Sequence, residues 1–387
     1  MPTVKCTQCG TAYNVPEEKL GRVKCKCGVM LPGTAAGVSS AKANKTVVET
    51  EQLNDAQVKA LVENLKQSKA RILAEIRKAV IGQDQVVDEV LMSFFAGAHC
   101  LITGVPGLAK TLLIKSIGDI LDLQFRRIQF TPDLMPSDIT GTEVLEEDKA
   151  THQRGLRFKK GPLFGNIILA DEINRTPPKT QAALLEAMQE HQVTVAGVTY
   201  KLPEPFFVLA TQNPIEQEGT YALPQIQQDR FMFSSIIGHL PRDQEVQVIE
   251  QTTRATSAKL ERVMSGEELL HYQRIVREVP VVEPIVRYAV QIAAASRPTE
   301  KSAPDFVRDY VSWGASSRAS IYLVLAAKAR AVLDGRFHVA VKDIQSVAMP
   351  VLRHRVVTNF RAESARIKSE DLVKKLLEYV KPPASGL

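Results

Sequence analysis

The residues with the most recognisable chemistry lie in the stretch 101–111, LITGVPGLAKT. A short apolar run leads into a loop with two glycines, a lysine and a threonine, and apolar residues at helical spacing follow. The N–H groups of such a strand–loop–helix, with the positive helix N-terminus, suit a polyphosphate. Lys110 would reach the β- and γ-phosphates, and the Thr111 hydroxyl would bind Mg²⁺. The alternative is a glycine-rich turn followed by a surface lysine.

One position of the loop departs from the usual phosphate-loop pattern. Ala109 precedes the lysine, where that pattern has glycine. Because alanine resists a positive φ, we expect the turn to depend on Gly104 and Gly107. The residues expected to contact the nucleotide are Gly104, Val105, Pro106, Gly107, Leu108, Ala109, Lys110 and Thr111.

Two acids follow the next buried strand. The sequence 166–172, NIILADE, places Asp171 and Glu172 after four apolar residues. In an open parallel sheet, ligands bind at this carboxyl end of the strands. Asp171 would hold Mg²⁺ and Glu172 would polarise the attacking water. A strand that merely ends in solvated acids is the alternative, but the order after a phosphate loop favours a catalytic pair.

A third polar tip is expected at the same edge of the sheet. The apolar strand 206–210 ends in Thr-Gln-Asn-Pro, which places Asn213 close to Asp171. The Asn213 amide could hydrogen-bond a γ-phosphate or a water, although Asn-Pro by itself is also a turn signal.

The first 27 residues contain four of the five cysteines, as the pairs Cys6–Cys9 and Cys25–Cys27. Each pair is followed by glycine, and four thiolates suit a tetrahedral Zn²⁺. Disulfides are the alternative, which a reducing cytoplasm disfavours. The second pair is one residue shorter than the usual zinc-ribbon spacing. Cys100 lies in the apolar approach to the loop and is expected to be a buried core thiol.

Composition limits the class of protein. The chain has 387 residues, of which 44% are hydrophobic and 24% charged, as in ordinary soluble proteins. It contains no apolar run of membrane-spanning length and no signal-peptide core, so we expect a cytoplasmic protein. The net charge of +6 permits a nucleic-acid partner without requiring one.

Changes in pattern divide the chain into four predicted parts: a zinc-ribbon-like module at 1–31, a flexible linker at 32–52, an α/β nucleotide-binding core at 53–240 and a helical lid at 241–382. The stretch 131–165 contains two strand-like pieces, and 192–202 alternates around Ala196-Gly197 like a β-hairpin. Lid helices are expected at 243–251, 265–279, 283–295, 317–333 and 341–352.

In this order the motifs GVPGLAKT, IILADEINR, LATQNPIEQEGTYALP, DRF (229–231) and GASSRA (314–319) resemble those of the MoxR family of AAA+ ATPases. The resemblance covers about 63–382. It implies a P-loop αβα parallel-sheet domain followed by an all-helical lid, with 131–165 and 192–202 as the hairpin insertions of its clade.

The resemblance also assigns roles by position. Asn213 is similar to the sensor that orients the water, and Arg230 resembles the arginine finger that acts on a neighbouring subunit's ATP. Arg318 resembles the lid sensor that contacts the γ-phosphate of its own subunit. Val80, Ile81 and Gly82 look like the adenine-binding segment. From local chemistry alone, Arg230 could pair with Asp229, Arg318 could be a surface charge, and the basic cluster 353–355 would lie on the lid surface or, second, face a neighbour or the nucleotide.

These observations predict an Mg²⁺-dependent ATP hydrolase. The resemblance implies a ring, a hexamer, that remodels, assembles or inserts cofactors into client proteins, often with a partner that carries a von Willebrand A domain. A nucleic-acid motor is the second hypothesis, because the sequence has no helix-turn-helix and no strong basic stripe. A nucleotide-gated scaffold with little turnover is the third.

Overall fold

The computed structural model describes residues 3–5, 12–14, 23, 24, 26 and 55–383, except 106, 148–153, 215–220 and 254–257. It separates into the units Met1–Gln57 and Val58–Leu387. In the first, β1 (Thr3–Lys5) pairs antiparallel with β2 (Ala12–Asn14). The cysteines Cys6, Cys9, Cys25 and Cys27 and the predicted linker lie outside the described residues. No described helix is both long and apolar enough to cross a membrane.

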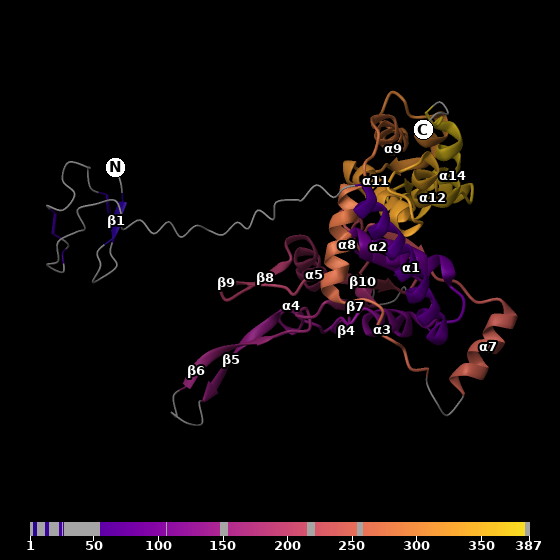
Figure 1. Ribbon diagram of the computed structural model, residues 1–387. Coiled ribbons are helices and arrows are strands. Elements are labelled where there is room, and N and C mark those ends of the chain that lie inside the picture. The colour runs from indigo at the N-terminus through magenta and orange to yellow at the C-terminus, as the bar shows by residue number, and fades with distance from the viewer. Residues whose placement is uncertain are drawn as a thin grey trace. The chain divides into compact units, whose positions relative to one another are not determined.

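The second unit is built around a parallel five-stranded sheet (Figure 1). Its order is β11-β3-β10-β7-β4. The strands are β3 (Cys100–Thr103), β4 (Phe125–Gln129), β7 (Ile167–Asp171), β10 (Phe207–Gln212) and β11 (Phe233–Ile236). Because all five run the same way, the segments that follow them meet at one edge. This confirms the predicted α/β sheet.

Both faces of the sheet are buried, as alternation along its strands requires. Ile167, Leu169 and Leu209 join one core with the helices α1 (Asp55–Ala79), α2 (Asp84–Ala96) and α3 (Lys110–Ile120). Ile168 and Ala170 join a second core with α5 (Pro178–Glu190). The short helix α4 (Pro136–Thr140) and the 3₁₀ turn Ile173–Arg175 lie along the second core.

Cys100 is a free, fully buried thiol on β3, as predicted. Burial raises its pKa to about 12, so it is unreactive as a nucleophile. Its Sγ lies 3.6 Å from Ser235 Oγ, which also bonds the buried carboxyl of Glu89 on α2. Burial raises the pKa of Glu89 as well. These groups tie α2 to β3 and β11 inside the core.

Two hairpins extend from the second unit, and both were predicted. β5 (Gly141–Glu147) pairs with β6 (Arg154–Lys160), and β8 (Gln192–Val195) pairs with β9 (Val198–Lys201). Phe158 of β6 stacks on Tyr200 of β9 with 4.1 Å between ring centroids. This stacked pair fixes one hairpin against the other near their bases.

The C-terminal part is helical (Figure 1). The short helix α6 (Gln225–Gln228) still precedes β11. The helices after β11 are α7 (Arg242–Thr252), α8 (Gly266–Glu278), α9 (Glu283–Ala295), α10 (Asp305–Tyr310), α11 (Ser317–Leu333), α12 (Val341–Leu352), α13 (Phe360–Ser364) and α14 (Ser369–Tyr379). The lid is not all helix: β12 (Val311–Trp313) pairs with β13 (Val357–Thr358). α11 packs on α2 and α12 packs against β11, so one hydrophobic core joins the lid to the sheet.

Candidate functional site

The phosphate loop follows β3 directly and leads into α3. Gly107 has φ +84°, and nothing lies within 4 Å of the position where a Cβ would stand. Gly104 is required for a different reason: a Cβ there would lie 2.7 Å from the carbonyl oxygen of Ile237, after β11. Ala109 has φ 56°, so the expectation that the two glycines alone supply the turn was wrong. Ala109 occupies the left-handed conformation itself, immediately before the helix, at a steric cost that glycine would not have.

Lys110 starts α3 and is 9% exposed. Its Nζ donates to the carbonyl oxygen of Gly104 at 2.7 Å, which folds the side chain back over the loop. Burial lowers the pKa of the Lys110 ammonium, while the charges of Asp171 and Glu172 act in the opposite direction. A buried cation whose hydrogen-bond partner is a carbonyl rather than a carboxylate has capacity for an anionic ligand.

Asp171 ends β7 and Glu172 follows it in the left-handed conformation, with φ 57°. The side chain that organises both acids is Thr211 of β10, which is fully buried. Thr211 Oγ1 donates to Asp171 Oδ1 at 2.7 Å and accepts from the Glu172 backbone N–H at 2.9 Å. The hydroxyl therefore fixes one carboxylate and the turn that carries the other. Thr211 was not among the predicted site residues, because its only signal in the sequence is its place at the end of a predicted strand.

Three further polar side chains hold the acids, and the sequence did not predict them either. Arg127 of β4 bonds Asp171 Oδ2 through Nη2 at 2.7 Å. Gln129, at the end of the same strand, donates to Glu172 Oε2 at 2.9 Å, and Arg175 Nη1 lies 2.9 Å from that oxygen. β4 lies beside β7 in the sheet, with Gln129 opposite Asp171. Strand order, which the sequence does not state, brings these groups together.

Asn213 and the segment 80–82, two further predicted parts of the site, lie at the same edge of the sheet. Asn213 follows β10, is 4% exposed, and its carbonyl oxygen is 3.5 Å from Asn174 Nδ2. Val80 is buried, and Gly82 has φ +71° where a Cβ would lie 2.7 Å from Leu240. Gln83 Nε2 donates to the carbonyl oxygen of Gly238 at 2.7 Å. Ile81 is half-buried between them. The segment 80–82 thus packs on the stretch after β11 whose first residue, Ile237, touches the phosphate loop.

Arg230 and Arg318, the two predicted site arginines, do not lie at the edge of the sheet that carries the phosphate loop. Arg230 precedes β11, and β11 pairs with β3 so that Phe233 is opposite Cys100 and Ile236 opposite Thr103. The phosphate loop follows Thr103, so at least the four residues of the strand separate Arg230 from it, which is about 13 Å. Arg230 Nη1 donates to the carbonyl oxygen of Leu185 on α5 at 2.6 Å, in a cavity of about 310 Å³ that Glu186 and Glu190 also line.

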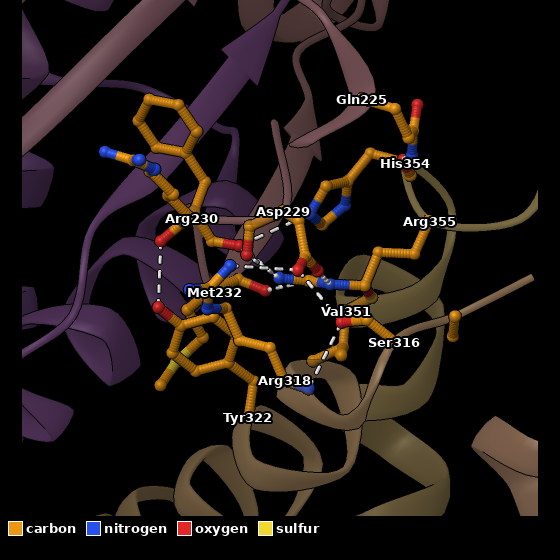
Figure 2. Close-up of polar contacts among 12 residues, drawn as sticks. Gln225, Asp229, Arg230, Met232, Ser316, Arg318, Tyr322, Val351, His354 and Arg355 are labelled. Carbon is orange, nitrogen blue, oxygen red and sulfur yellow. Dashed lines mark hydrogen bonds and ion pairs between the residues drawn. The ribbon is translucent and has the colours of Figure 1, made fainter. Parts of the chain in front are cut away.

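Arg318 lies in the same cluster as Asp229 and Arg230 (Figure 2). Its Nη1 is 3.0 Å from Asp229 Oδ2. Asp229 precedes β11, and the end of β11, not its start, lies beside the end of β3 from which the phosphate loop leads. The bond to Asp229 therefore places Arg318 away from its own phosphate loop, in disagreement with the expected contact with the γ-phosphate of its own subunit. The side chain remains 40% exposed.

The basic cluster after α12 does not form a lid surface. Arg355 is 2% exposed and His354 is 9% exposed. Arg355 bonds the Asp229 carboxylate, with 2.7 Å between Nε and Oδ1. Asp229 thus faces Arg355 and Arg318, while the Arg230 side chain extends to the opposite side (Figure 2). Asp229 and Arg230 therefore do not form the local ion pair that their adjacency allows.

Comparison with known proteins assigns the family. Residues 99–233 match the family model described as ATPase family associated with various cellular activities (AAA), and 305–376 match the AAA lid domain. The chain is 39% identical over 313 residues to Chaperone MoxR1 of Mycobacterium tuberculosis, covering 81% of this chain and 82% of that protein. The chain belongs to the MoxR family of AAA+ ATPases.

Two further comparisons agree with the MoxR assignment. Protein MoxR of Methylorubrum extorquens is 30% identical over 345 residues, which cover 84% of this chain and 98% of that protein. A solved structure from Cytophaga hutchinsonii, described as a candidate ATPase, is 37% identical with a TM-score of 0.79. It covers 85% of this chain and 98% of that one.

The site of this MoxR protein is that of an ATPase, and its residues fit ATP and Mg²⁺. The loop 104–111 and Lys110 would hold the phosphates. Thr111 and Asp171 supply the hydroxyl and carboxylate oxygens that a hard cation prefers. When bound, Mg²⁺ would offset negative charge on the phosphates. Glu172, tethered by Gln129 and Arg175, is held beside Asp171, where its carboxylate could accept a proton from a water.

We predict that Thr211→Val slows ATP hydrolysis more than it weakens ATP binding. Valine has the shape of threonine without its hydroxyl, so Asp171 and the Glu172 turn both lose a hydrogen-bond partner. We expect kcat to fall about tenfold or more, a loss of about 1.4 kcal/mol in transition-state stabilisation. The measurement is steady-state turnover together with the Kd for ATP.

Thr180→Val is the matched control. Thr180 is 2% exposed and its hydroxyl donates to the Leu134 carbonyl at 2.7 Å, away from the acids. Both variants should lose about 1–3 kcal/mol of unfolding free energy from an unsatisfied buried group. Equal kcat values for the two variants would show that Thr211 contributes to stability only.

Proposed function

We propose that this MoxR ATPase works as a ring in which each ATP is hydrolysed between two subunits, and that the ring remodels client proteins. The placement of Arg230 and Arg318 carries the proposal. Arg230 bonds Leu185 and Arg318 bonds Asp229, both away from their own phosphate loop, so we infer that they do not serve the ATP that this loop binds. Partly exposed arginines at that edge are placed to serve the site of another copy.

Within this proposal each subunit contributes two half-sites. One half-site holds ATP through the loop 104–111, with Lys110 against the phosphates and Glu172 as the general base for the attacking water. Asn213 orients that water, and segment 80–82 contacts adenine. The other half-site presents Arg230 and Arg318 to the neighbour's γ-phosphate. A guanidinium is always charged and offers a planar fork of donors, as developing phosphoryl charge requires.

The client-directed part of the proposal rests on the family and on the hairpins. One relative is named a chaperone. The β5–β6 hairpin exposes an apolar cross-strand pair, Leu145 and Leu156, with 64% and 69% of their surface accessible. Such a pair can contact another protein. We further propose a hexamer, a cytoplasmic location and a partner with a von Willebrand A domain, as the family resemblance implies.

We expect Glu172→Gln to bind ATP but hydrolyse it at least about a hundredfold more slowly, because glutamine cannot accept the proton of the attacking water. The ATP-bound ring should then retain its client, which co-purification followed by mass spectrometry would identify. Glu267→Gln, an exposed acid on α8, is the matched control. Wild-type turnover by Glu172→Gln would disprove the assignment of the base. Recovery of nucleic acid in place of protein, with ATPase activity stimulated by DNA, would favour the nucleic-acid motor instead.

The shared site can be tested by mixing two inactive variants. Arg230→Ala keeps an intact phosphate loop, and Lys110→Ala keeps an intact arginine. Each alone should lose about a thousandfold in rate or more. In mixed rings some interfaces combine the good loop with the good arginine, so activity should exceed the sum of the separate preparations. No recovery, with subunit exchange confirmed by fluorescence transfer, would contradict the trans role.

For the N-terminal module we propose one Zn²⁺ held by Cys6, Cys9, Cys25 and Cys27. The support is the cysteine pattern alone. The purified chain should contain about one zinc, measured by atomic emission, and Cys6→Ser with Cys27→Ser should lose it while ATP turnover continues, because the core does not use these thiolates. Cys100→Ser is the control and should keep the metal. Full zinc content in the double variant would refute the four-thiolate site.

A further inference from the structure

The turn that carries Arg230 is held on its carbonyl side by side chains of the lid, while its N–H groups bond backbone carbonyl oxygens of α6 and of His99. Residues 229–232 precede β11 and form no part of the sheet. Each of their four backbone carbonyl oxygens accepts a hydrogen bond from the lid (Figure 2). The bonds are Arg355 Nη2 to Asp229 O at 2.8 Å, Tyr322 Oη to Arg230 O at 2.8 Å, Arg355 Nη2 to Phe231 O at 2.7 Å and Arg355 Nη1 to Met232 O at 3.2 Å.

Arg355 is saturated by this arrangement. Its remaining bonds join Nε to the Asp229 carboxylate and Nη1 to the Val351 carbonyl, which makes five bonds for the five N–H groups of a guanidinium. The Tyr322 ring lies 5.1 Å from the Arg355 guanidinium and packs on it. Burying such a charge costs several kcal/mol unless every donor is satisfied. Arg355 can therefore occupy this place only when the turn 229–232 has its observed shape.

The same carboxylate positions the second arginine. Asp229 Oδ1 is bonded by Arg355, and Oδ2 accepts from Arg318 Nη1 at 3.0 Å and from Ser316 Oγ at 2.9 Å. Ser316 is also the N-cap of α11, and its Oγ accepts from the Arg318 backbone N–H. One ion pair, between the buried Arg355 and the partly buried Asp229, thus links the positions of Arg230 and Arg318.

We infer that Arg355 and Tyr322 are positioning residues for the neighbouring subunit's active site. They touch neither their own phosphate loop nor its acids. They hold Arg230 through its backbone and Arg318 through Asp229. The positions of both arginines therefore depend on how the lid docks against the sheet. This inference rests on the proposed shared site and adds to it the residues that aim the arginines. A shift of about 1 Å in such a group can cost about a hundredfold in rate.

The test uses Arg355→Lys and Tyr322→Phe in the full-length chain. Lysine keeps the charge beside Asp229 but has three donors on one nitrogen, so it cannot bond the carboxylate and three carbonyls together. We expect Arg355→Lys to lower kcat by about ten- to a hundredfold while the Kd for ATP changes less than about twofold. Tyr322→Phe removes one hydroxyl and should lower kcat by a smaller factor without preventing folding.

Arg336→Lys is the matched control. Arg336 forms a two-point ion pair with the fully buried Asp343, elsewhere in the lid, at 2.8 and 2.7 Å. It should lower the melting temperature, as Arg355→Lys does, but leave kcat unchanged. Equal kcat losses in the two variants would reduce Arg355 to a general contributor to lid stability.

Mixing with Lys110→Ala subunits distinguishes misplaced arginines from damage to the variant's own phosphate loop. A Lys110→Ala subunit retains Arg355, Arg230 and Arg318, so it should restore turnover at the intact phosphate loop of an Arg355→Lys neighbour. Recovery for Arg355→Lys or, should that variant not fold, for Tyr322→Phe supports the inference. If Arg230→Ala recovers but the folded positioning variant does not, the inference about Arg355 and Tyr322 is wrong, while the shared site still stands. Failure of Arg230→Ala to recover would overturn the shared site itself.

Discussion

Parallel strand direction is the constraint on which the rest of this molecule depends. Five strands that run the same way deliver the phosphate loop, the acids and Asn213 to one edge of the sheet. The same geometry places the turn before β11, with Arg230, at the other edge. If the proposed shared site is correct, a single subunit carries both parts of a phosphoryl-transfer site at opposite edges of its sheet. Assembly is the simplest way to bring such parts together.

The orientation of the lid depends on a second constraint, the free-energy cost of burying a charged side chain. Arg355 is almost fully buried, and its five donors find partners only in the turn 229–232, the Asp229 carboxylate and the last turn of α12. An unsatisfied guanidinium in that place would be strongly destabilising. Hydrophobic packing of α11 on α2 brings the lid to the sheet, and the polar network selects one orientation. This directional requirement distinguishes the docking from a merely apolar contact.

At the nucleotide edge the backbone adopts conformations that glycine would accept more readily. Ala109 has φ 56° and Glu172 has φ 57°, and they lie directly after a loop turn and a strand end. Strain of this kind persists where surrounding contacts over-determine the chain. For Glu172 those contacts are identifiable: the backbone N–H bonds Thr211, and the carboxylate bonds Gln129 and Arg175. These bonds fix both the backbone and the carboxylate of Glu172.

Elements and chemistry that depend on residues near one another in the chain could be predicted from the sequence. The phosphate loop, the acids after a buried strand, the two hairpins and helix bounds such as 283–295 and 317–333 could be read from periodicity and spacing, because each depends on residues near one another. The positive φ of Ala109 could not be predicted, because alanine usually avoids this backbone conformation.

Contacts between residues far apart in the chain could not be predicted in this way, because they depend on how the elements pack. Thr211, Arg127 and Gln129 reach the acids because β4, β7 and β10 are neighbours in the sheet, an order that no local pattern records. The basic cluster at 353–355 looked like surface, and Arg318 looked like a ligand of its own subunit's phosphate. Both interpretations failed for the same reason: charge placement depends on how the lid docks, and docking is settled by packing between segments far apart in the chain.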